Sequence, residues 1–308
     1  MKIIHLCPGL SEVNGMAVAA GYLAKEQNAV LADVENVCSA NLHDAEEIWI
    51  HSCWRPCIWR ACWLALRERK RLVRMLHGNL DPVRLGYHGW KKWLVGPIER
   101  YFLRRAAVVV ATCQAEAEWI RKYEPRVKKI EVTDLKRFFD LNHETHEIHE
   151  RVEGRSLHLL YLGRRHPLKG VEYLEEAVSQ LTPLVRRSLG GGGFPVPRSP
   201  ELKIVSNAFG EEKENVWEWC DVLVLPTLSE NFGLVVAEAL ERGKRVITTD
   251  GAPAWGENLS RVEHVERVEG GEMLAGYGGR LIYLKGYLGG SDEKRVVLLK
   301  RAIERVCG

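Results

Sequence analysis

The sequence predicts an α/β protein of two Rossmann-like domains, each a parallel sheet with helices on both faces. In both halves of the chain, short apolar runs alternate with segments of helical character. The runs are apolar throughout, as expected for strands buried on both faces of a sheet. A length of 308 residues is enough for two domains of ordinary size.

The first half begins with a buried strand at 2–6, a loop at 8–16 and a helix at 17–25. Further strands are expected at 48–51, 73–76 and 107–111, the last followed by a helix at 112–122. Residues 142–155 are polar, with three histidines spaced by threes, and we interpret them as a solvated linker. The predicted boundary lies near Gly154, which gives domains of residues 1–154 and 155–308.

The second half repeats the alternation. Strands are expected at 157–162, 202–205, 221–226 and 245–249, and helices at 171–181, at 211–219, from about 233, and at 292–306. Residues 183–200 are rich in glycine, proline and arginine and are interpreted as a mobile surface loop.

The strand at 221–226 leads into the segment on which the functional interpretation depends. Pro226 ends this strand because proline has no N–H for the ladder, and a polar loop then precedes the helix that begins near Gly233. Free N–H groups at such a helix start bind phosphate. Glu230 lies in the loop and Glu238 more than a turn inside the helix, which suits a sugar–diphosphate–nucleoside with hydroxyls on both sides of its phosphates. The alternative is a surface helix start with two solvated acids.

The segment at 229–240, SENFGLVVAEAL, resembles the Glu-x7-Glu motif of retaining family-four glycosyltransferases of the GT-B fold. It is especially similar to bacterial enzymes that build lipopolysaccharide core or capsule. The segment at 77–82, with the WKK and ER…LRRA stretches after it, is similar to the "HGMLDP…WKK…ER…LRRA" pattern of the same enzymes. The segment at 163–170, GRRHPLKG, resembles their "GRLHPKKG" loop, so the resemblance covers both halves.

The resemblance implies roles for individual residues. Glu230 would contact the donor sugar, Glu238 the ribose hydroxyls, and His77 would lie near the transferred sugar. Arg164 and Lys169 would hold the donor diphosphate, for which bidentate and point charges are suited. The remaining predicted donor-binding residues are Gly15 in the first loop and Asn231, Phe232, Gly233, Leu234 and Val235.

The implied fold is GT-B, with the two sheets facing a central cleft and a final helix that often packs back on the first domain. The implied activity is transfer of a sugar, with retention, from a nucleotide-diphosphate sugar to a glycan acceptor of lipopolysaccharide core, O-antigen or capsule type. Neither a cofactor nor a metal is required, and no Asp-x-Asp motif lies where a metal would need it. One cluster of possible metal ligands consists of His51, Cys53, Cys57 and Cys62. Its spacing is not that of a zinc knuckle, and free cysteine is often a core residue.

Departures from the family pattern leave alternatives open. The first loop has only Gly15 where relatives carry a Gly-Gly pair, and the segment at 130–135 lacks their Pro-Asn-Gly turn. A non-catalytic nucleotide-sugar-binding protein of the GT-B fold is therefore an alternative. A nicotinamide dehydrogenase would need Gly-x-Gly-x-x-Gly after the first strand, which 8–16 does not supply. We expect no nucleic-acid partner.

Net charge is +3, but it is unevenly distributed. Between Arg55 and Arg105 thirteen Lys and Arg face three acids, a difference of +10, with five tryptophans interleaved. This basic aromatic segment suggests an anionic partner. No apolar run approaches the ~20 residues that span a bilayer, and the cysteines are interpreted as reduced thiols. We therefore expect a cytoplasmic protein attached peripherally to the anionic inner face of the plasma membrane, where lipid-linked glycan acceptors lie.

Overall fold

The computed structural model describes residues 2–10, 14–38, 42–141, 156–188, 200–206, 208–257, 259, 264–268 and 271–307. The chain divides into two compact units, Met1–Phe138 and Phe139–Gly308. The boundary predicted near Gly154 and the linker at 142–155 lie outside the described residues. No helix among the described ranges is long and apolar enough to cross a membrane.

The first unit is built on a six-stranded sheet in the order β2-β1-β3-β4-β5-β6, in which every pairing is parallel. Its strands are β1 (Ile3–Cys7), β2 (Val30–Asp33), β3 (Glu47–His51), β4 (Arg71–Met75), β5 (Val108–Ala111) and β6 (Ile130–Val132). The connection from β1 to β2 runs in one direction across the sheet, and those from β3 onward run in the other. The switch point therefore lies between β1 and β3, where open α/β sheets bind ligands beyond their carboxyl ends.

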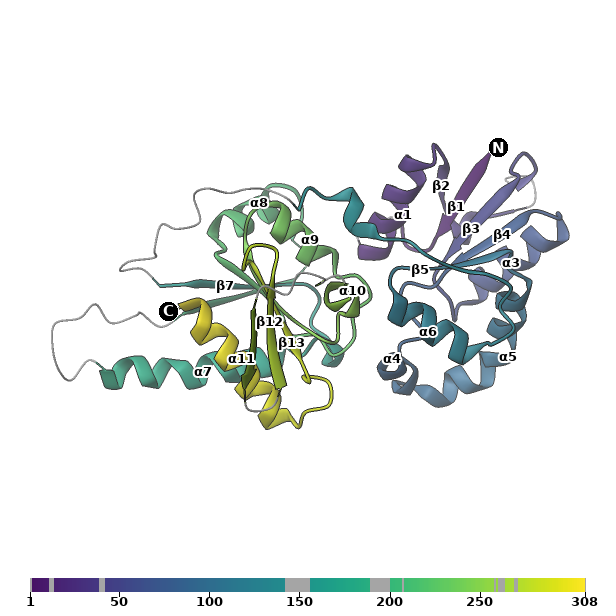
Figure 1. The fold of residues 1–308 in the computed structure, drawn as a ribbon. Helices are drawn as coiled ribbons and strands as arrows, with labels where there is room; N and C mark the ends of the chain where they lie inside the picture. The colour runs from purple at the N-terminus through teal and green to yellow at the C-terminus, as the bar shows by residue number, and fades with distance from the viewer. Residues whose placement is uncertain are drawn as a thin grey trace. The chain divides into compact units, whose positions relative to one another are not determined.

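Helices cover both faces of this sheet. They are α1 (Gly15–Glu26), α3 (Pro56–Arg67), α4 (Pro82–Gly86), α5 (Gly89–Arg105) and α6 (Gln114–Tyr123), with 3₁₀ turns at Val34–Asn36 and Leu135–Phe138. Figure 1 shows α1 and α3 on opposite sides of the strands. Two helix starts follow from local chemistry: the Asn14 side chain caps α1, and Pro56 provides a preset first turn for α3.

The second unit has a seven-stranded sheet in the order β11-β12-β13-β10-β9-β7-β8. Its strands are β7 (His158–Leu162), β8 (Glu201–Val205), β9 (Val222–Leu225), β10 (Arg245–Thr249), β11 (His264–Val268), β12 (Gly271–Gly276) and β13 (Leu281–Lys285). From β8 to β13 the pairing is parallel, whereas β12 and β11 extend this sheet antiparallel. The switch point of this sheet lies between β7 and β9.

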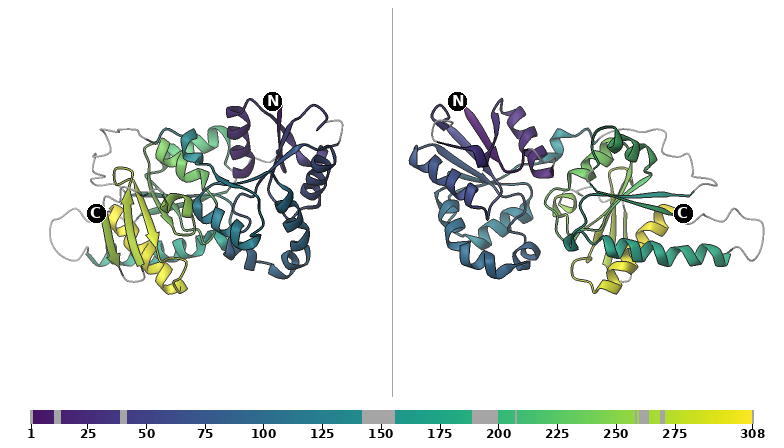
Figure 2. Two further views of the ribbon diagram at one scale, coloured as in Figure 1. Left: turned by 45° about the vertical axis from the view of Figure 1, so that its right-hand side comes forward. Right: turned by 180° about the vertical axis from the view of Figure 1, so that it is seen from behind.

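The helices of the second unit are α7 (Val171–Ser188), α8 (Gly210–Trp219), α9 (Leu234–Glu241), α10 (Pro253–Gly256) and α11 (Asp292–Cys307), with a 3₁₀ turn at Pro167–Lys169. Figures 1 and 2 show α7 and α11 on one side of the sheet and α8 and α9 on the other. The final helix packs on α7 and β13 of its own unit.

The two parallel sheets and their helices confirm the predicted fold class. The antiparallel extension, β11 to β13, and the edge strand β2 were not predicted. The edge strand β11 (HVERV) carries polar side chains on its exposed faces, so no apolar run marks it. The short apolar runs of β2 (VLAD) and β13 (LIYLK) were overlooked. The predicted loop at 183–200 begins too early, because α7 continues past Pro183 to Ser188.

Candidate functional site

Two loops meet at the switch point of the second unit. One follows β7 and ends with Lys169, and the other follows β9 and carries Glu230. Neighbouring parallel strands end at the same edge of a sheet, so these loops lie side by side. The Lys169 ammonium and the Glu230 carboxylate form an ion pair there, with 16% and 21% of their side chains exposed. The opposite charges predicted at 169 and 230 are thus brought together, and both remain accessible.

Close backbone packing joins the two loops. The Leu168 carbonyl accepts from the Leu228 N–H at 2.9 Å and from the Thr227 hydroxyl at 3.1 Å. Gly170 follows with φ +61°, and a Cβ placed there would lie 2.2 Å from the Pro226 carbonyl oxygen. Glycine is required at 170 both for this conformation and for this approach.

The start of α9 lies immediately after Glu230. The Glu230 N–H donates to the Gly251 carbonyl at 2.8 Å, and its carboxylate accepts from the Asn231 N–H at 3.0 Å. Gly233 has φ +68°, and no side chain caps the helix that begins at Leu234. An uncapped helix start with a positive dipole end is suited to an anion.

An aromatic pair, Phe232 and Trp255, packs against this turn. The buried Trp255 of α10 lies 5.3 Å from the Phe232 ring between centroids, and its indole N–H donates to the Phe232 carbonyl. Phe232 is 3% exposed, so its side chain is a packing residue of the turn. The predicted donor-binding role at 232 can therefore be carried only by its backbone.

The second glutamate has a partner that the sequence analysis did not identify. Glu238 Oε2 lies 2.7 Å from Nζ of Lys213 in α8, and both side chains are about one quarter exposed, 21% and 27%. The ion pair with Lys213 holds the Glu238 carboxylate against α8. No spacing rule connects 213 and 238, although Lys213 is the one cation in the sequence of α8.

The two remaining cations of the β7 loop differ from Lys169. Arg164 is exposed, and its carbonyl accepts from the Tyr161 hydroxyl at 3.0 Å. Arg165 is paired with Glu175 and is also exposed. Arg164 is therefore exposed to an incoming anion, whereas Arg165 is already paired with an acid.

The first unit brings three histidines together at its own switch point. His51 ends β3, and its Nδ1 lies 2.8 Å from Nε2 of His77. Its Nε2 lies 2.9 Å from Nδ1 of His5 in β1. Burial lowers the pKa of all three, that of His77 to about 3, so the rings are neutral at physiological pH. Only His77 was predicted as a site residue; His51 was considered only in a cluster with three cysteines, and His5 was given no role.

Gly15, predicted in a phosphate-facing loop, is instead the first residue of α1. It is exposed, and Asn14 before it caps the helix by accepting from the Ala17 N–H at 2.9 Å. A strong N-cap residue extended the helix two residues further than predicted. The start of α1, rather than a glycine turn, is what this position contributes.

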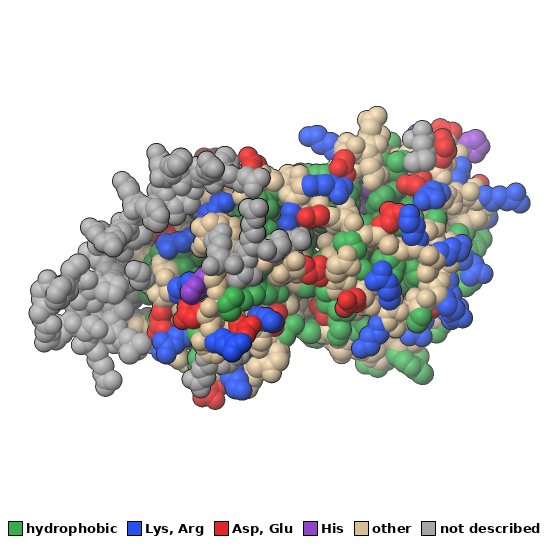
Figure 3. Space-filling model, in the orientation of Figure 1, with side chains coloured by type: hydrophobic (Ala, Val, Ile, Leu, Met, Phe, Trp, Pro, Cys, Tyr) green, Lys and Arg blue, Asp and Glu red, His purple; other side chains and the backbone are tan. Residues whose placement is uncertain are grey.

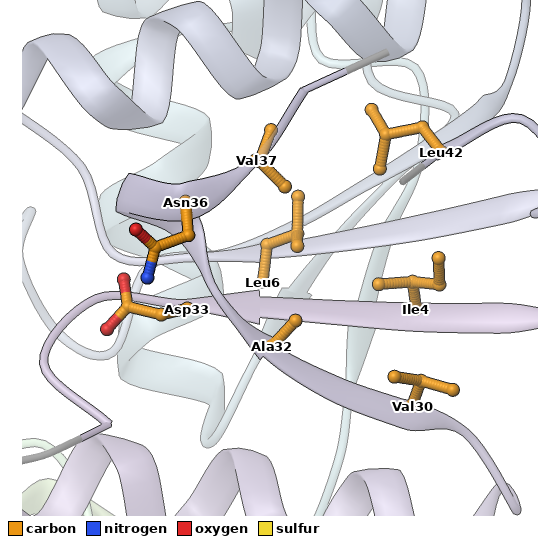
Figure 4. Close-up of a pocket in the computed structure, with 8 residues that line it drawn as sticks. All are labelled: Ile4, Leu6, Val30, Ala32, Asp33, Asn36, Val37 and Leu42. Atoms are coloured by element: carbon orange, nitrogen blue, oxygen red, sulfur yellow. The ribbon is translucent and has the colours of Figure 1, made fainter. Parts of the chain in front are cut away.

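The first unit also contains a small cavity of about 230 Å³ between β1, β2 and the turn that follows β2 (Figure 4). Its lining is mostly apolar, with Asp33 and Asn36 at one end. Sites that enclose drug-sized ligands begin near 300 Å³, so the cavity is too small for a nucleotide sugar. Among the described residues, no group of three or more His, Cys, Asp or Glu could hold a metal ion.

The structure buries some side chains of the basic aromatic segment and exposes others. Arg74 and Glu99 form a fully buried ion pair 2.7 Å apart, and the Trp59 indole also donates to Glu99. Other aromatic and aliphatic side chains of the segment are exposed: Trp63, Tyr87, Trp90, Trp93, Leu94, Ile98 and Tyr101. Most of these belong to α5, where apolar and basic side chains are interspersed (Figure 3).

Comparison with known proteins gives matches for both units. Residues 18–135 match the glycosyl transferase 4-like domain family, and residues 156–267 match the glycosyl transferases group 1 family. A search by sequence among curated proteins finds no match.

Solved structures share the whole fold. Anabaena HepE in complex with UDP aligns with a TM-score of 0.62 at 16% identity, covering 99% of this chain and 91% of that one. Sucrose-phosphate synthase from Thermosynechococcus elongatus gives 0.63 at 14%, covering 99% and 90%. The lipopolysaccharide outer core galactosyltransferase WaaB gives 0.54 at 14%, covering 100% and 92%.

Proposed function

Because the chain belongs to the glycosyltransferases of the GT-B fold, we propose that it transfers a sugar from a nucleotide-diphosphate sugar to a glycan acceptor, with retention of configuration. The observation that carries this proposal is the meeting of Lys169 and Glu230 before the uncapped start of α9. A cation suits a diphosphate and an acid suits sugar hydroxyls. Their direct contact requires that phosphate and sugar be neighbours in the ligand, as they are in a nucleotide sugar.

The donor would extend along α9. Its diphosphate would lie at the N–H groups of Leu234 and Val235, next to Lys169, and the exposed Arg164 would add a bidentate contact. Glu238, charged beside Lys213, accepts from the ribose hydroxyls. HepE has been solved with UDP and with UDP-glucose, which supports a nucleotide-sugar donor and makes uridine nucleotides the first to test.

The chemistry of this proposal depends on the leaving group. In front-face substitution the bond from the anomeric carbon to the diphosphate breaks, the acceptor oxygen bonds on the same face, and the leaving phosphate takes the acceptor proton. Negative charge develops on the phosphate, and preorganised groups that stabilise such charge supply the largest catalytic contribution. Lys169 and the α9 start are the preorganised groups, and Arg164 would join them when the donor binds, so the proposed mechanism requires no metal.

The acceptor is proposed to be a glycan of lipopolysaccharide core, O-antigen or capsule type, presented at an anionic membrane face. The exposed aromatic side chains of α5 suit an interface, where tryptophan places its half-apolar ring. Lys91 lies 5.5 Å above the Trp90 ring and Arg105 3.7 Å above that of Tyr101. Each such cation contributes about 1 kcal/mol near anionic lipid.

A thermal-shift screen over nucleotide sugars and nucleoside diphosphates tests the donor site. A ligand that binds only the folded protein stabilises it, by about 2.7 kcal/mol at a hundred times its dissociation constant. We expect nucleotides of one base to raise the unfolding temperature of the wild type and of Arg165→Ala, and to raise that of Lys169→Ala clearly less. No response to any nucleotide would contradict the proposed donor.

Hydrolysis and transfer assays separate an enzyme from a binding protein. We expect slow hydrolysis of the donor that accelerates with a glycan acceptor. A chain that binds the donor but shows neither reaction is the non-catalytic alternative.

Vesicle sedimentation at low salt tests the membrane surface. Wild type should sediment with anionic vesicles, and Trp90→Ser with Trp93→Ser should not, while donor binding is unchanged in both. Changing Arg67, Arg69, Lys70 and Arg71 to Gln should have a smaller effect, because Arg67 and Arg71 are already paired with Glu68 and Glu47. Failure of the wild type to sediment would end the membrane proposal.

A further inference from the structure

Four side chains form a continuous hydrogen-bonded row in the first unit. His5 Nε2 lies 3.0 Å from Gln27 Oε1, His5 Nδ1 2.9 Å from His51 Nε2, and His51 Nδ1 2.8 Å from His77 Nε2. The row begins at the end of α1, crosses β1 and β3 and ends just after β4. It thus crosses the switch point, and every ring nitrogen in it except His77 Nδ1 faces a partner within the row.

Ring packing fixes the three imidazoles in addition to their hydrogen bonds. His5 and His51 lie 5.2 Å apart between centroids at 26°, His51 and His77 5.1 Å apart at 31°, and Trp49 stacks on His5 at 14°. His5 and His51 are fully buried, while His77 reaches the surface with 7% exposed. Of the three rings, only that of His77 reaches the surface.

All three rings are neutral, because burial is the largest influence on each pKa and lowers it. The charged groups that face them do not reverse this: Arg84 lowers the pKa of His77, Arg74 lowers that of His51, and Glu47 raises that of His5 less than burial lowers it. A neutral imidazole has one N–H donor and one lone-pair acceptor. Each ring must therefore donate in one direction along the row and accept from the other.

Gln27 sets that direction. Its carbonyl oxygen can only accept, so His5 donates from Nε2 and accepts at Nδ1. His51 then donates from Nε2 to His5 and accepts at Nδ1, and His77 donates from Nε2 to His51. The lone pair of His77 Nδ1 is left over. A backbone bond anchors Gln27 itself, whose N–H donates to the Leu23 carbonyl at 3.0 Å.

The backbone at His77 is fixed from the opposite side. His77 has φ +53°, and the N–H of Gly78 donates to Glu116 Oε1 at 2.6 Å. The other oxygen of Glu116 accepts from both the N–H and the hydroxyl of Thr112 at 2.8 Å. Ring and backbone are thus both held, as a preorganised contact requires.

We propose that Gln27, His5 and His51 are positioning residues that hold His77 as its Nε2–H tautomer, so that Nδ1 accepts a hydrogen bond from a sugar hydroxyl of the substrate. The last clause rests on the proposed function; the tautomer does not. The row fixes which nitrogen of each ring carries the proton. It does not conduct protons, because the Gln27 amide at its far end cannot take up a proton from His5.

Exchanging Gln27 tests this directly. Gln27→Glu keeps an acceptor at the end of the row, whereas Gln27→Lys offers only donors. Gln27 is half-buried at a helix end, so both variants should fold. Long-range ¹⁵N–¹H spectra of histidine-labelled protein distinguish the two tautomers, with His158 of the second unit as the internal control.

In wild type and Gln27→Glu we expect His5, His51 and His77 all as Nε2–H tautomers. In Gln27→Lys all three should reverse, leaving Nδ1–H on His77. An Nδ1–H tautomer of His77 in the wild type, or an unchanged His77 in Gln27→Lys, overturns the proposal. His51→Gln, which retains one donor and one acceptor, should preserve the wild-type His77 tautomer, and His51→Leu should not.

Kinetics separate this inference from the proposed function. With the row reversed, His77 presents a donor in place of an acceptor, so the hydroxyl must rotate to accept where it had donated. We expect this mismatch to lower kcat/KM by roughly threefold to tenfold, as for the loss of one neutral hydrogen bond. If the tautomers reverse and kcat/KM is unchanged, the positioning row stands and the sugar contact of His77 is wrong. If the tautomers do not follow residue 27, the row is wrong whatever the rate.

Discussion

The two switch points have the same strand order and opposite chemistry. Both sheets have their second strand outside the first, with the switch between β1 and β3 in one unit and between β7 and β9 in the other. In the second unit a partly exposed ion pair, Lys169 and Glu230, occupies that position. In the first unit it is a row of buried neutral imidazoles.

This difference shows how one topology serves two tasks. Fixed charge is what a diphosphate needs, since the ligand carries charge and creates more of it as its bond to sugar breaks. Neutral groups with a defined donor and acceptor direction suit uncharged hydroxyls, because directional hydrogen bonds distinguish positions without attracting competing ions. The carboxyl ends of both sheets supply the geometry, and the side chains decide which ligand group is served.

Removing Lys169 should have the largest effect. Lys169→Ala is expected to lower kcat on the order of a hundredfold, because the removed charge stabilises the leaving phosphate. Arg165→Ala is the matched control, a cation four residues away already paired with Glu175, and should change kcat little. Steady-state rates of donor turnover decide it; similar losses in both variants would mean that the loop acts only through net charge.

Glu238 should act on binding rather than on rate. Glu238→Ala is expected to raise the donor KM on the order of ten- to a hundredfold, since a hydrogen bond to a charged group contributes about 1.5–3 kcal/mol. Lys213→Ala should raise it less, and Glu214→Ala, whose partner is Arg242, should leave it unchanged. An unchanged KM in Glu238→Ala would place the ribose elsewhere.

Gly170 tests whether loop packing positions Lys169. Gly170→Ala puts a Cβ 2.2 Å from the Pro226 carbonyl and strains a positive φ, at a cost of about 1–3 kcal/mol for the conformation alone. Gly279→Ala is the control, with φ +75° and nothing within 4 Å of an added Cβ. Urea unfolding should show the larger loss for Gly170→Ala, together with reduced turnover; equal losses would show that the approach to Pro226 is unimportant.

The smallest expected effect is the contribution of the histidine row to folding stability at acidic pH. The folded pKa values of His5, His51 and His77 lie below the unfolded value of about 6.5. Below that pH the unfolded chain binds more protons than the folded one, so stability falls as pH decreases through about 6.5 and is regained as pH rises.

Urea unfolding at about pH 7.5 and pH 5 should show a smaller decrease for His51→Gln than for wild type. Comparing variants cancels groups of opposite sign, such as Glu116, whose pKa burial raises. Equal decreases would mean that the row does not resist protonation.

Sequence reasoning located the elements because buried parallel strands are apolar throughout, as in β9 (VLVL). It singled out Glu230 and Lys169 because the segments that follow two such strands resemble motifs of the glycosyltransferase family. It did not find β11, whose exposed face carries polar residues, and it overlooked β12 and the apolar, buried β13 (LIYLK). It placed Gly15 in a loop because the cap at Asn14 was not considered.

Partners that meet only through folding were beyond reach. Lys213 approaches Glu238 from a different helix, and Trp255 reaches the Phe232 carbonyl from a turn after β10. The histidine row depends on register: His5 and His51 belong to neighbouring strands, and Gln27 ends a helix packed against β1. A histidine in an apolar run is usually a core residue, and nothing in the spacing of 5, 27, 51 and 77 suggests contact.

The most direct test of the charged switch point is calorimetric titration of wild type and Lys169→Ala with two ligands of one base: the nucleoside diphosphate selected by the thermal-shift screen and the corresponding free nucleoside. If Lys169 binds the diphosphate, the variant should lose roughly tenfold or more in affinity for the nucleoside diphosphate, as for a lost contact to a charged group, and bind the nucleoside as wild type does. Equal losses for the two ligands would contradict the assignment of Lys169 and Glu230 to the phosphate–sugar junction.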